Sequence, residues 1–420
     1  MTPEQLTALA SMFEPKPDGE FLLPLDVAKR YNFPEATGKG QKIAVISPGG
    51  GYEKKYVEKY ITEVCGLGSF PTIVDKCIPK SYTPKPCYDY KKNPKEALYT
   101  AEIYANLELI SAIANDAEIV AYLIKKDGKE LSRIWRAIED AVDVGCSIIL
   151  ICHSMPETDV IILNRDVGTF YLDNALTMGN FDRVLLKAKK HGVTVCASTG
   201  NSLDMNSFLK ANEVAIRHVE FPGSHPHVLS IGGTSLPKLS DNEGTESAWN
   251  EKTPFPPPFG QLFNTTTGGF SVWHKRPEWQ KIISNNQGHY EEAIISDRRG
   301  VPDVAAHASS DYGYRILYGP YQFDRVGGTS SAAPIWAGLI ARMNEKLGFN
   351  VGFLNEALYE IAYNISPTAF NDIIEGNNNR RVGPYGIFYS AQSYWDACTG
   401  LGSPNGEKLL EALKNWPFYQ

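Results

Sequence analysis

A serine in a tight glycine turn is the residue best placed to act as a nucleophile. Ser330 follows Gly327, Gly328 and Thr329, and the apolar stretch after it predicts a helix that begins at Ser330 itself. At a helix N-terminus the hydroxyl is exposed, and the backbone N–H groups and helix dipole favour a developing anion. The competing interpretation is that Ser330 only caps the helix, because serine is a preferred N-cap residue.

A serine nucleophile needs a general base to take its proton. The chain has eight histidines, and none of them precedes His153, so no histidine lies on the helix that follows the first strands. That helix carries Glu102 and, four residues later on the same face, Asn106. A carboxylate can serve as the base where its pKa and position suit. The alternative is that Glu102 is an ordinary solvated surface group.

Strands and helices alternate along the chain, which predicts a mostly parallel, doubly wound α/β sheet with helices on both faces. Functional groups of such a sheet gather at the carboxyl ends of its strands. Residues 240–300 are polar and rich in Pro and Gly, so they predict long surface loops rather than a domain boundary. Buried strands are expected at 42–47, 118–124, 147–152, 193–199 and 227–234, and helices at 52–64, 97–114, 131–144 and 181–192.

The composition of the chain limits the classes of partner that it is expected to bind. Hydrophobic residues make up 43% and charged residues 21%, as in ordinary globular proteins. The net charge of −7 argues against nucleic acid as a main partner. No apolar run is long enough to span a bilayer, so no membrane partner is expected. No signal peptide is visible, which predicts a cytoplasmic protein as given, or a secreted mature fragment. The oligomeric state is left open.

The seven cysteines predict buried thiols rather than a metal site. Cys146, Cys152 and Cys196 lie in apolar strands, where an inert thiol is the expected reading. Cys77 and Cys87 flank a Pro-rich loop and would form a disulfide in an oxidising compartment. No CxxC motif and no Cys/His cluster with zinc spacing occurs.

A series of sequence blocks in order along nearly the whole chain resembles the sedolisin family of serine-carboxyl peptidases, and in particular its kumamolisin-like members. The resemblance implies a subtilisin-like fold over 21–420 as a single peptidase domain, after an N-terminal extension at 1–20. It also implies cleavage of peptides or proteins at acidic pH by Ser, Glu and Asp, with an oxyanion Asp and one Ca²⁺ ion. Among the blocks are FLLPLDVAKRYNFP, HVLSIGGTSL, RGVPDVAAHASSDYGYRI, GGTSSAAPIWAGLIARMN and WDACTGLGSPNG.

The family's catalytic positions are only partly retained. Its serine falls on Ser330 and its glutamate on Glu102, but the Asp four residues later is Asn106. The oxyanion Asp of the GDSG motif is Asn201. Two supporting positions also differ: the acidic residue before the triple glycine is replaced by Ser47-Pro48, and a usual Trp is His153.

These changes leave two functions open. An Asn donates a hydrogen bond at any pH, so Asn201 could stabilise an oxyanion, although it cannot act as an acid. Asn106 removes the carboxyl that would share a proton with Glu102. One hypothesis is an endopeptidase of impaired activity that forms a Ser330 acyl-enzyme. The other is an inactive pseudopeptidase that serves as a protein-binding or structural module.

The calcium positions implied by the resemblance lie near the C-terminus. Asp372 and Ile373 match the first pair of ligands, and Asp396 matches the last. The two backbone-carbonyl positions are usually glycine and fall on Gln392 and Tyr394 here, which puts the tight glycine turn in question. Oxygen ligands of this kind suit Ca²⁺.

Three further motifs have readings that are mainly structural. The glycines at 49–51 follow a strand, but no Lys-Ser/Thr comes after them, so a nucleotide site is not favoured. Residues 153–157 fall where the family has its substrate-binding edge. Asp303 in RGVPDV is expected to be structural rather than catalytic.

Overall fold

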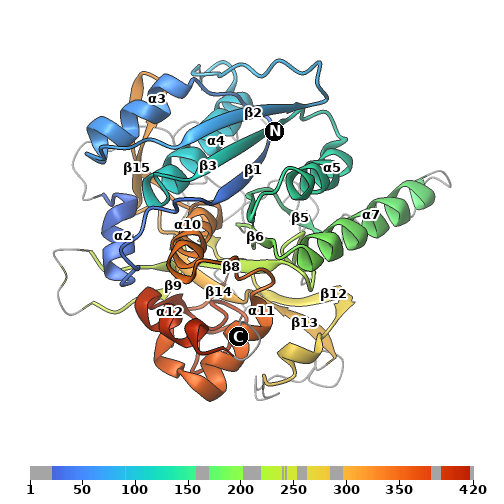
Figure 1. Cartoon of the computed structure of the whole chain (residues 1–420), viewed down its shortest axis with the longest axis vertical. Helices are drawn as coiled ribbons and strands as arrows, with labels where there is room; N and C mark the ends of the chain where they lie inside the picture. Colours follow the sequence, from blue (N-terminus) through green and yellow to red (C-terminus); the bar gives the residue numbers. More distant parts are fainter. Residues whose placement is uncertain are drawn as a thin grey trace.

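An eight-stranded sheet forms the centre of the computed structural model (Figure 1). The structure describes residues 21–89, 91–157, 170–201, 219–238, 241, 244–252, 263–283, 297–379 and 389–416. The strand order β14–β8–β6–β4–β1–β3–β2 is parallel throughout, and β9 joins β8 antiparallel. The strands are β1 (Lys42–Pro48), β2 (Thr72–Ile78), β3 (Glu118–Ile124), β4 (Ile148–Ile151), β6 (Thr194–Ser198), β8 (Leu229–Ser235), β9 (Ser247–Ala248) and β14 (Val304–His307). The predicted fold class is therefore confirmed.

Alternate residues of each strand enter two separate cores, one on each face of the sheet. Ile43 and Val45 of β1 pack with α4 (Pro94–Ile113) and α10 (Thr329–Leu347). Ala44 and Ile46 pack on the other face with α5 (Glu130–Asp143) and α7 (Phe170–Lys190). Because both faces of the strands are covered, their sequences are nearly continuous apolar runs.

Smaller elements complete the fold. They are α2 (Pro24–Arg30), α3 (Lys54–Lys59), η1 (Tyr60–Val64), β5 (Met155–Pro156), β7 (Glu220–Phe221), β10 (Asn250–Lys252), β11 (Phe263–Thr265), β12 (Gly269–Lys275), η2 (Glu278–Gln280), β13 (Arg298–Val301), β15 (Tyr314–Tyr318), β16 (Tyr321–Val326), α11 (Asn355–Glu360), η3 (Ile361–Ile365), η4 (Pro367–Ala369), β17 (Phe370–Asn371), β18 (Ser403–Pro404) and α12 (Gly406–Lys414). Among the described residues, no helix combines the length and apolarity that crossing a bilayer requires.

Most predicted elements agree with the structure, with some corrections. The strand at 118–124 is found with the same bounds, and the predicted helix at 181–192 is part of α7, which begins earlier, at Phe170. Residues 240–300 are not only surface loops: β10 pairs with β11, and β12 pairs with β13. Short strands with one buried face lack a long apolar run, so the polar composition concealed them. Residues 1–20 lie outside the described residues, and the division at residue 21 stays a prediction.

The cysteines are all free thiols. Cys146, Cys152 and Cys196 are buried, as expected. The disulfide suggested for Cys77 and Cys87 is not formed. Cys77 belongs to edge strand β2, whereas the backbone N–H of Cys87 donates to Thr100 Oγ1 on α4 at 3.0 Å, so the two residues are held by different elements.

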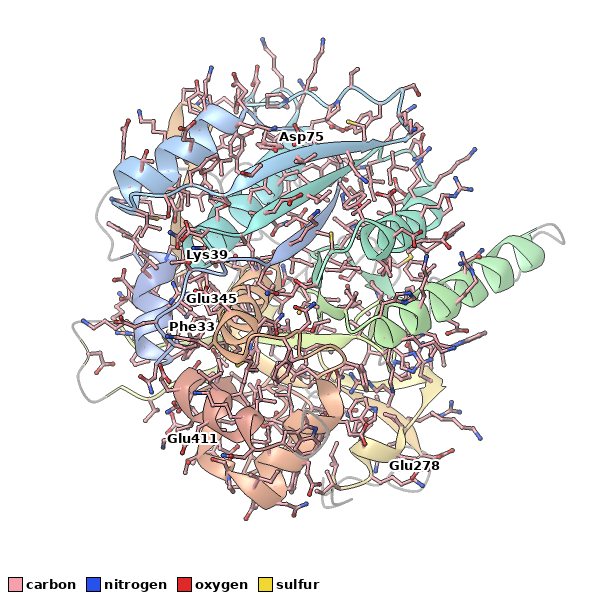
Figure 2. The ribbon with its side chains drawn as sticks, viewed as in Figure 1. Phe33, Lys39, Asp75, Glu278, Glu345 and Glu411 are labelled. Carbon is pink, nitrogen blue, oxygen red and sulfur yellow. The ribbon has the colours of Figure 1, made fainter. Side chains whose placement is uncertain are left out.

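Helices α4 and α10 both run from the carboxyl edge of the sheet to its amino edge. A Cβ on Gly50, just after β1, would lie 2.5 Å from the carbonyl oxygen of Tyr99 in α4. At the opposite edge, Asn344 of α10 donates to Gln41 Oε1, just before β1, at 2.9 Å. Glu345 also accepts the backbone N–H of Lys39 at 2.9 Å on this side (Figure 2). The two helices are therefore parallel to each other.

A glycine lets these two helices approach closely. A Cβ on Gly338 of α10 would lie 2.3 Å from Cγ2 of Ile113 at the end of α4. Arg342 Nε also donates to the Ile113 carbonyl at 2.7 Å. No side chain other than hydrogen fits at Gly338 without moving α4, so this contact fixes the spacing between the helices.

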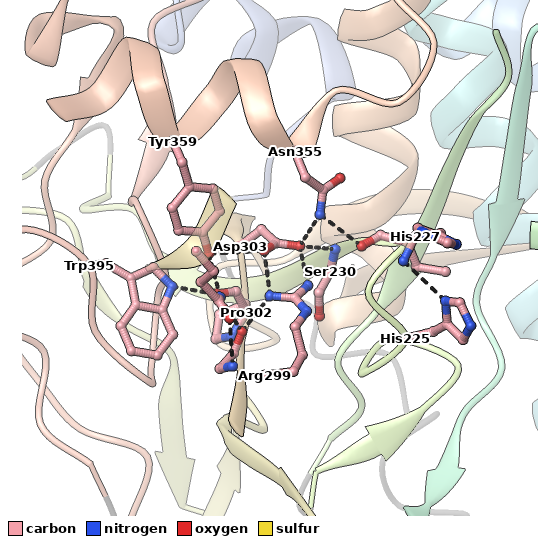
Figure 3. A network of polar contacts seen from close by, with 12 residues as sticks. His225, His227, Ser230, Arg299, Pro302, Asp303, Asn355, Tyr359 and Trp395 are labelled. Carbon is pink, nitrogen blue, oxygen red and sulfur yellow. Dashed lines mark hydrogen bonds and ion pairs between the residues drawn. The ribbon is translucent and has the colours of Figure 1, made fainter. Parts of the chain in front are cut away.

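A buried ion pair anchors the end of β13 beside β14 (Figure 3). Arg299 and Asp303 are fully buried, and Arg299 donates through both Nη atoms to the carboxylate at 2.6 and 2.7 Å. Asn355 and Tyr359 each donate to the same carboxylate at 3.0 Å, and the Ser230 N–H donates at 2.8 Å. Every lone pair of Asp303 is directed at structural groups, which supports its expected structural role.

Asp303→Asn should destabilise the fold strongly, because it leaves the Arg299 guanidinium buried without its counter-charge. Breaking a buried pair in this way costs about 3–5 kcal/mol. The matched control is Glu139→Gln, which removes the exposed pair with Arg183 and should cost at most about 1 kcal/mol. Urea unfolding of both variants measures the difference. A loss below about 1 kcal/mol in Asp303→Asn would show that the network does not anchor this region.

Candidate active site

Ser330 lies in the first turn of α10, at the carboxyl edge of the sheet. The helix begins at Thr329 and its N-cap is Gly328, whose φ of 101° is the left-handed conformation that favours glycine. A Cβ on Gly327 would lie 2.5 Å from the Ala308 carbonyl oxygen. The reading of Ser330 as a simple N-cap is therefore wrong. The two glycines form the cap and the tight turn, and they leave Ser330 partly exposed on the helix.

Asn201 is bound to the same helix terminus. Its Oδ1 accepts the Thr329 backbone N–H at 2.9 Å and the Thr329 hydroxyl at 3.0 Å. A backbone N–H can only donate, so the oxygen of the amide must face it and Nδ2 must point the other way. The Nδ2 atom lies beside Gly328, where an added Cβ would be 2.8 Å from it. The segment after β6 and the start of α10 thus hold the Asn201 amide donor beside Gly328, in the turn that leads to Ser330.

The packing of α4 against α10 brings Glu102 to the same end of the helix pair as Ser330. A helix rises about 1.5 Å per residue, so Ser330 is about 12 Å along α10 from the Gly338–Ile113 contact. Asn106 and Glu102 are about 10 and 16 Å along α4 in the same direction. The structure therefore brings the four predicted catalytic positions to one edge of the sheet, although no hydrogen bond joins Glu102 to Ser330 in the described residues.

Glu102 differs from the other buried acid of this helix. Glu108 is fully buried, and its Oε2 accepts the Leu317 N–H of β15 at 2.8 Å, which binds it to a different neighbour. Glu102 is only partly buried. Burial raises the pKa of Glu102 to about 7, and the positive charge of Lys126 opposes this rise. A carboxyl with such a pKa exchanges protons near neutrality, which is what a general base requires.

Two residues after β4 complete the surroundings of Glu102. The Cys152 thiol, which interacts electrostatically with Glu102, lies 3.5 Å from the Ser330 carbonyl oxygen. This contact places the end of β4 between the two candidate catalytic groups. Burial raises the pKa of the Cys152 thiol, so it stays protonated. Burial, with a smaller effect from Lys126, lowers the pKa of His153 to about 3, so this ring is neutral.

Asn106 supplies no charge to the site. Its residue is 1% exposed, and its Oδ1 makes no hydrogen bond within the part of the chain that the structure describes. Buried acceptors of this kind usually find a partner. Ser47, at one of the other altered positions, is also buried. One turn along α4 from Glu102 there is therefore an amide, whose Oδ1 has no partner among the described residues, in place of a second acid.

The remaining sequence motifs have structural roles. The glycines at 49 and 50 permit contact with α4, since added Cβ atoms would lie 2.8 and 2.5 Å from atoms of Tyr99. Within residues 153–157, Met155 and Pro156 form β5, which pairs with β7. Glu157 is buried and accepts the Val272 N–H at 2.8 Å. A role for this stretch as a substrate edge stays a prediction.

Sequence analysis missed two residues of the site. Thr329 joins Asn201 to the Gly200 N–H, which donates to its Oγ1 at 3.1 Å. Lys126 stands just beyond β3, and the rule that functional groups follow parallel strands could have indicated it. Its contact with α4 depends on the fold, and a lysine in a charged loop is ordinarily solvated.

The predicted calcium positions converge on one loop. Asp396 is fully buried, and its Oδ2 accepts the Gln392 N–H at 3.1 Å. Asp372 Oδ2 accepts the Tyr394 N–H at 2.9 Å. Tyr394 has a φ of 67°, so it adopts the left-handed turn that a glycine would make more easily. The left-handed turn is therefore made at Tyr394 but not at Gln392, and the calcium loop stays a prediction.

The two carboxylates of this loop lack a basic partner. Among the described residues, no Lys or Arg forms an ion pair with Asp372 or Asp396. Burial raises the pKa of Asp396 to about 7 and that of Asp372 above its usual value. No group of three or more His, Cys, Asp or Glu side chains in the described part has metal-binding geometry, so any site here would rely on backbone oxygens as well.

Comparison with known proteins identifies related chains. The model of the subtilase family matches residues 90–364. Kumamolisin of Bacillus sp. (strain MN-32) is 34% identical over 396 residues, which cover 93% of this chain and 63% of kumamolisin. Sedolisin of Pseudomonas sp. (strain 101) is 32% identical over 243 residues, which cover 56% of this chain and 38% of sedolisin. The chain thus spans less than two thirds of the length of either relative.

A solved structure agrees in fold. The structure of Pseudomonas sedolisin, a serine-carboxyl proteinase complexed with two molecules of pseudo-iodotyrostatin, superposes with a TM-score of 0.72 at 23% identity. The match covers 95% of this chain and 99% of that one. Together with the parallel sheet and the glycine turn at Ser330, these similarities show that the chain belongs to the subtilase family, as a member of its sedolisin group.

Proposed function

We propose that the protein is a weak serine endopeptidase with Ser330 as nucleophile, Glu102 as general base and Asn201 as oxyanion donor. The observation that carries the proposal is the orientation of Asn201. Because Thr329 occupies the amide oxygen, the Nδ2 donor remains beside the Ser330 turn. The packing of α4 on α10 places a partly buried carboxyl, that of Glu102, at the same end of the helix pair. The substrate is a peptide or a protein.

The proposed reaction follows acyl transfer. Ser330 Oγ attacks the scissile carbonyl carbon while its proton passes to Glu102, and the carbonyl oxygen becomes an oxyanion that accepts a hydrogen bond from Asn201 Nδ2. The C–N bond then breaks, and the departing amine takes the proton from Glu102. Water hydrolyses the resulting ester by the reverse sequence of proton transfers, which releases the acid product and restores the Ser330 hydroxyl.

The pH range of this reaction follows from the state of Glu102. A base must be ionised, so the rate should rise as the pH increases through the raised pKa of Glu102, near 7. The Asn201 amide donates a hydrogen bond at every pH, so it adds no second ionisation to the pH–rate profile. The expectation of strictly acidic operation rests on a pair of coupled acids, and Asn106 leaves Glu102 without such a partner. We therefore place the active range near and above neutrality.

Weak activity is expected because the acid–base machinery is incomplete. Asn106 provides no acidic proton and no charge to hold Glu102, and its buried Oδ1 has no partner within the described part of the chain. Loss of such assistance typically lowers rates by about 10²–10⁴-fold. The same observation favours a second candidate function, in which the scaffold binds peptides without cleaving them.

Ser330→Ala should abolish cleavage, because the nucleophile is removed. The test incubates wild type and variant with a denatured protein and a mixed peptide library from about pH 4 to pH 9, and products are identified by mass spectrometry. Ser331→Ala is the matched control, because Ser331 is the next residue along the helix. Its hydroxyl is buried and makes no hydrogen bond to the described residues. Absence of cleavage by folded wild type, with retained peptide binding, would favour the non-catalytic function. Cleavage that persists in Ser330→Ala would refute the assigned nucleophile.

We also propose one structural Ca²⁺ ion in the C-terminal loop. Asp372 and Asp396 would supply carboxylate oxygens, and Ile373, Gln392 and Tyr394 would supply backbone carbonyls. The fit rests on two carboxylates in one loop that lack a basic partner among the described residues. The ion would neutralise this charge and fasten the segment after β17 to the 392–396 turn.

Calcium should raise the melting temperature of the protein, and EGTA should reverse the effect. At a concentration 100 times the dissociation constant, the gain is about 2.7 kcal/mol. Asp396→Asn should abolish the response because it removes a ligand charge, whereas the exposed Asp116→Asn should keep it. Calorimetric scans with Ca²⁺ and with Mg²⁺ measure the response. A wild-type melting temperature unchanged by millimolar Ca²⁺ would exclude the site.

A further inference from the structure

Lys126 lies on the same side of α4 as Glu102. It follows β3 at the carboxyl edge of the sheet, and its Nζ is 4.0 Å from the centroid of the Tyr99 ring. Tyr99 precedes Glu102 by three residues, so the two side chains share one face of the helix. The ammonium group is thereby placed one helical turn from the carboxyl group.

The position of Lys126 is fixed by its surroundings. Tyr99 is 8% exposed and packs against the backbone of Gly49 and Gly50, where an added Cβ would lie 2.8 and 2.5 Å from its atoms. An ammonium over the face of such a ring gains roughly 0.5–2 kcal/mol of cation–π attraction. Lys126 is partly buried as a result, whereas its neighbour Lys125 is exposed and pairs with Asp127 at 3.5 Å.

Among the described residues, Lys126 supplies the charge that acts on Glu102, and the other groups around it are uncharged near neutral pH. The Cys152 thiol is protonated and the His153 ring is neutral, both because they are buried. Asn106, on the interior side of the helix, is an amide, and Ser330 on α10 is a hydroxyl. Lys126 interacts electrostatically with both Glu102 and His153 and acts on them in the same sense, since it favours the carboxylate and disfavours the imidazolium.

We propose that Lys126 is a positioning residue of the Ser330–Glu102 pair: the ammonium, held on Tyr99, keeps the Glu102 carboxylate ionised and available to accept the serine proton. The inference rests on the proposed function. An acid four residues after Glu102 could influence its ionisation, but that position is Asn106 in this chain. The proposal assigns the influence to Lys126 instead. Lys126 acts through Glu102 and does not itself contact the reacting atoms.

Lys126→Met should move the acid limb of the kcat/KM profile to higher pH by about one unit, because removing an opposite charge raises the pKa of a carboxyl and one unit is the lower end of such shifts. At a pH well above this limb, kcat and KM should approach the wild-type values. Lys126→Arg should restore the wild-type limb. The matched control is Lys125→Met, which removes an adjacent lysine that pairs with Asp127 at the surface and should leave the limb unchanged.

A second readout does not depend on peptidase activity. The carboxyl ¹³C resonance of Glu102, assigned by its loss in Glu102→Gln, is titrated by NMR in wild type, Lys126→Met and Lys125→Met. An upward shift only in Lys126→Met supports the proposal, even where an inactive wild type refutes the proposed function. Lys126→Gln replaces the methionine variant if that protein does not fold. A Glu102 titration that coincides in wild type and both Lys126 variants would overturn the inference.

Discussion

The packing of α4 on α10 at Gly338 is the contact on which the site depends. Both helices begin at the carboxyl edge of the parallel sheet, with the candidate nucleophile Ser330 on the first turn of α10 and the candidate base Glu102 on the third turn of α4. Because a Cβ at Gly338 would approach Ile113 to 2.3 Å, the helices meet with almost no side chain between them. Protein interiors are close-packed and transmit such constraints with little loss. A change of helix spacing at this point would move Ser330 relative to Glu102.

The electrostatics of the site suit a lone carboxylate. Burial favours the protonated form of Glu102, and no second acid stabilises the charged form. The positive charge at Lys126 opposes this tendency from the outer side of the helix. The neutral thiol of Cys152 and the neutral ring of His153 fill the space towards β4 without adding charge. Asn201 completes the arrangement, since an amide whose oxygen is held by Thr329 presents its donor without having to bind a proton.

The sequence predicted the parts of the fold that depend on local pattern. The apolar runs gave β1 and β3 almost to the residue, and the glycines before Ser330 indicated the tight turn. The short strands between 240 and 300 were missed because they lack a long apolar run and the segment is polar overall. The start of α7 was missed because Gly179, a poor helix former, interrupts the helical pattern before the predicted helix at 181–192.

The site could be predicted only where each residue carries its own signal. Ser330, Glu102 and Asn201 were found through motif and resemblance. Lys126 was not found, because its proposed role arises from its contact with Tyr99 and its charge near Glu102, and both residues lie more than twenty positions away in the sequence. The pattern of Cys77 and Cys87 likewise left a disulfide open, and in the structure both are free thiols. Long-range contacts of this kind leave no periodicity in the chain.

Acylation of Ser330 tests most directly whether Glu102 activates it. The folded protein is treated with a fluorophosphonate probe between about pH 5 and pH 9, the adduct is followed by intact mass, and the labelled residue is located by peptide mapping. The account predicts a single adduct on Ser330, formed at a rate that rises through about pH 7 and falls by about 10²-fold or more in Glu102→Gln. Labelling of another residue, no labelling, or an undiminished rate in Glu102→Gln would contradict it.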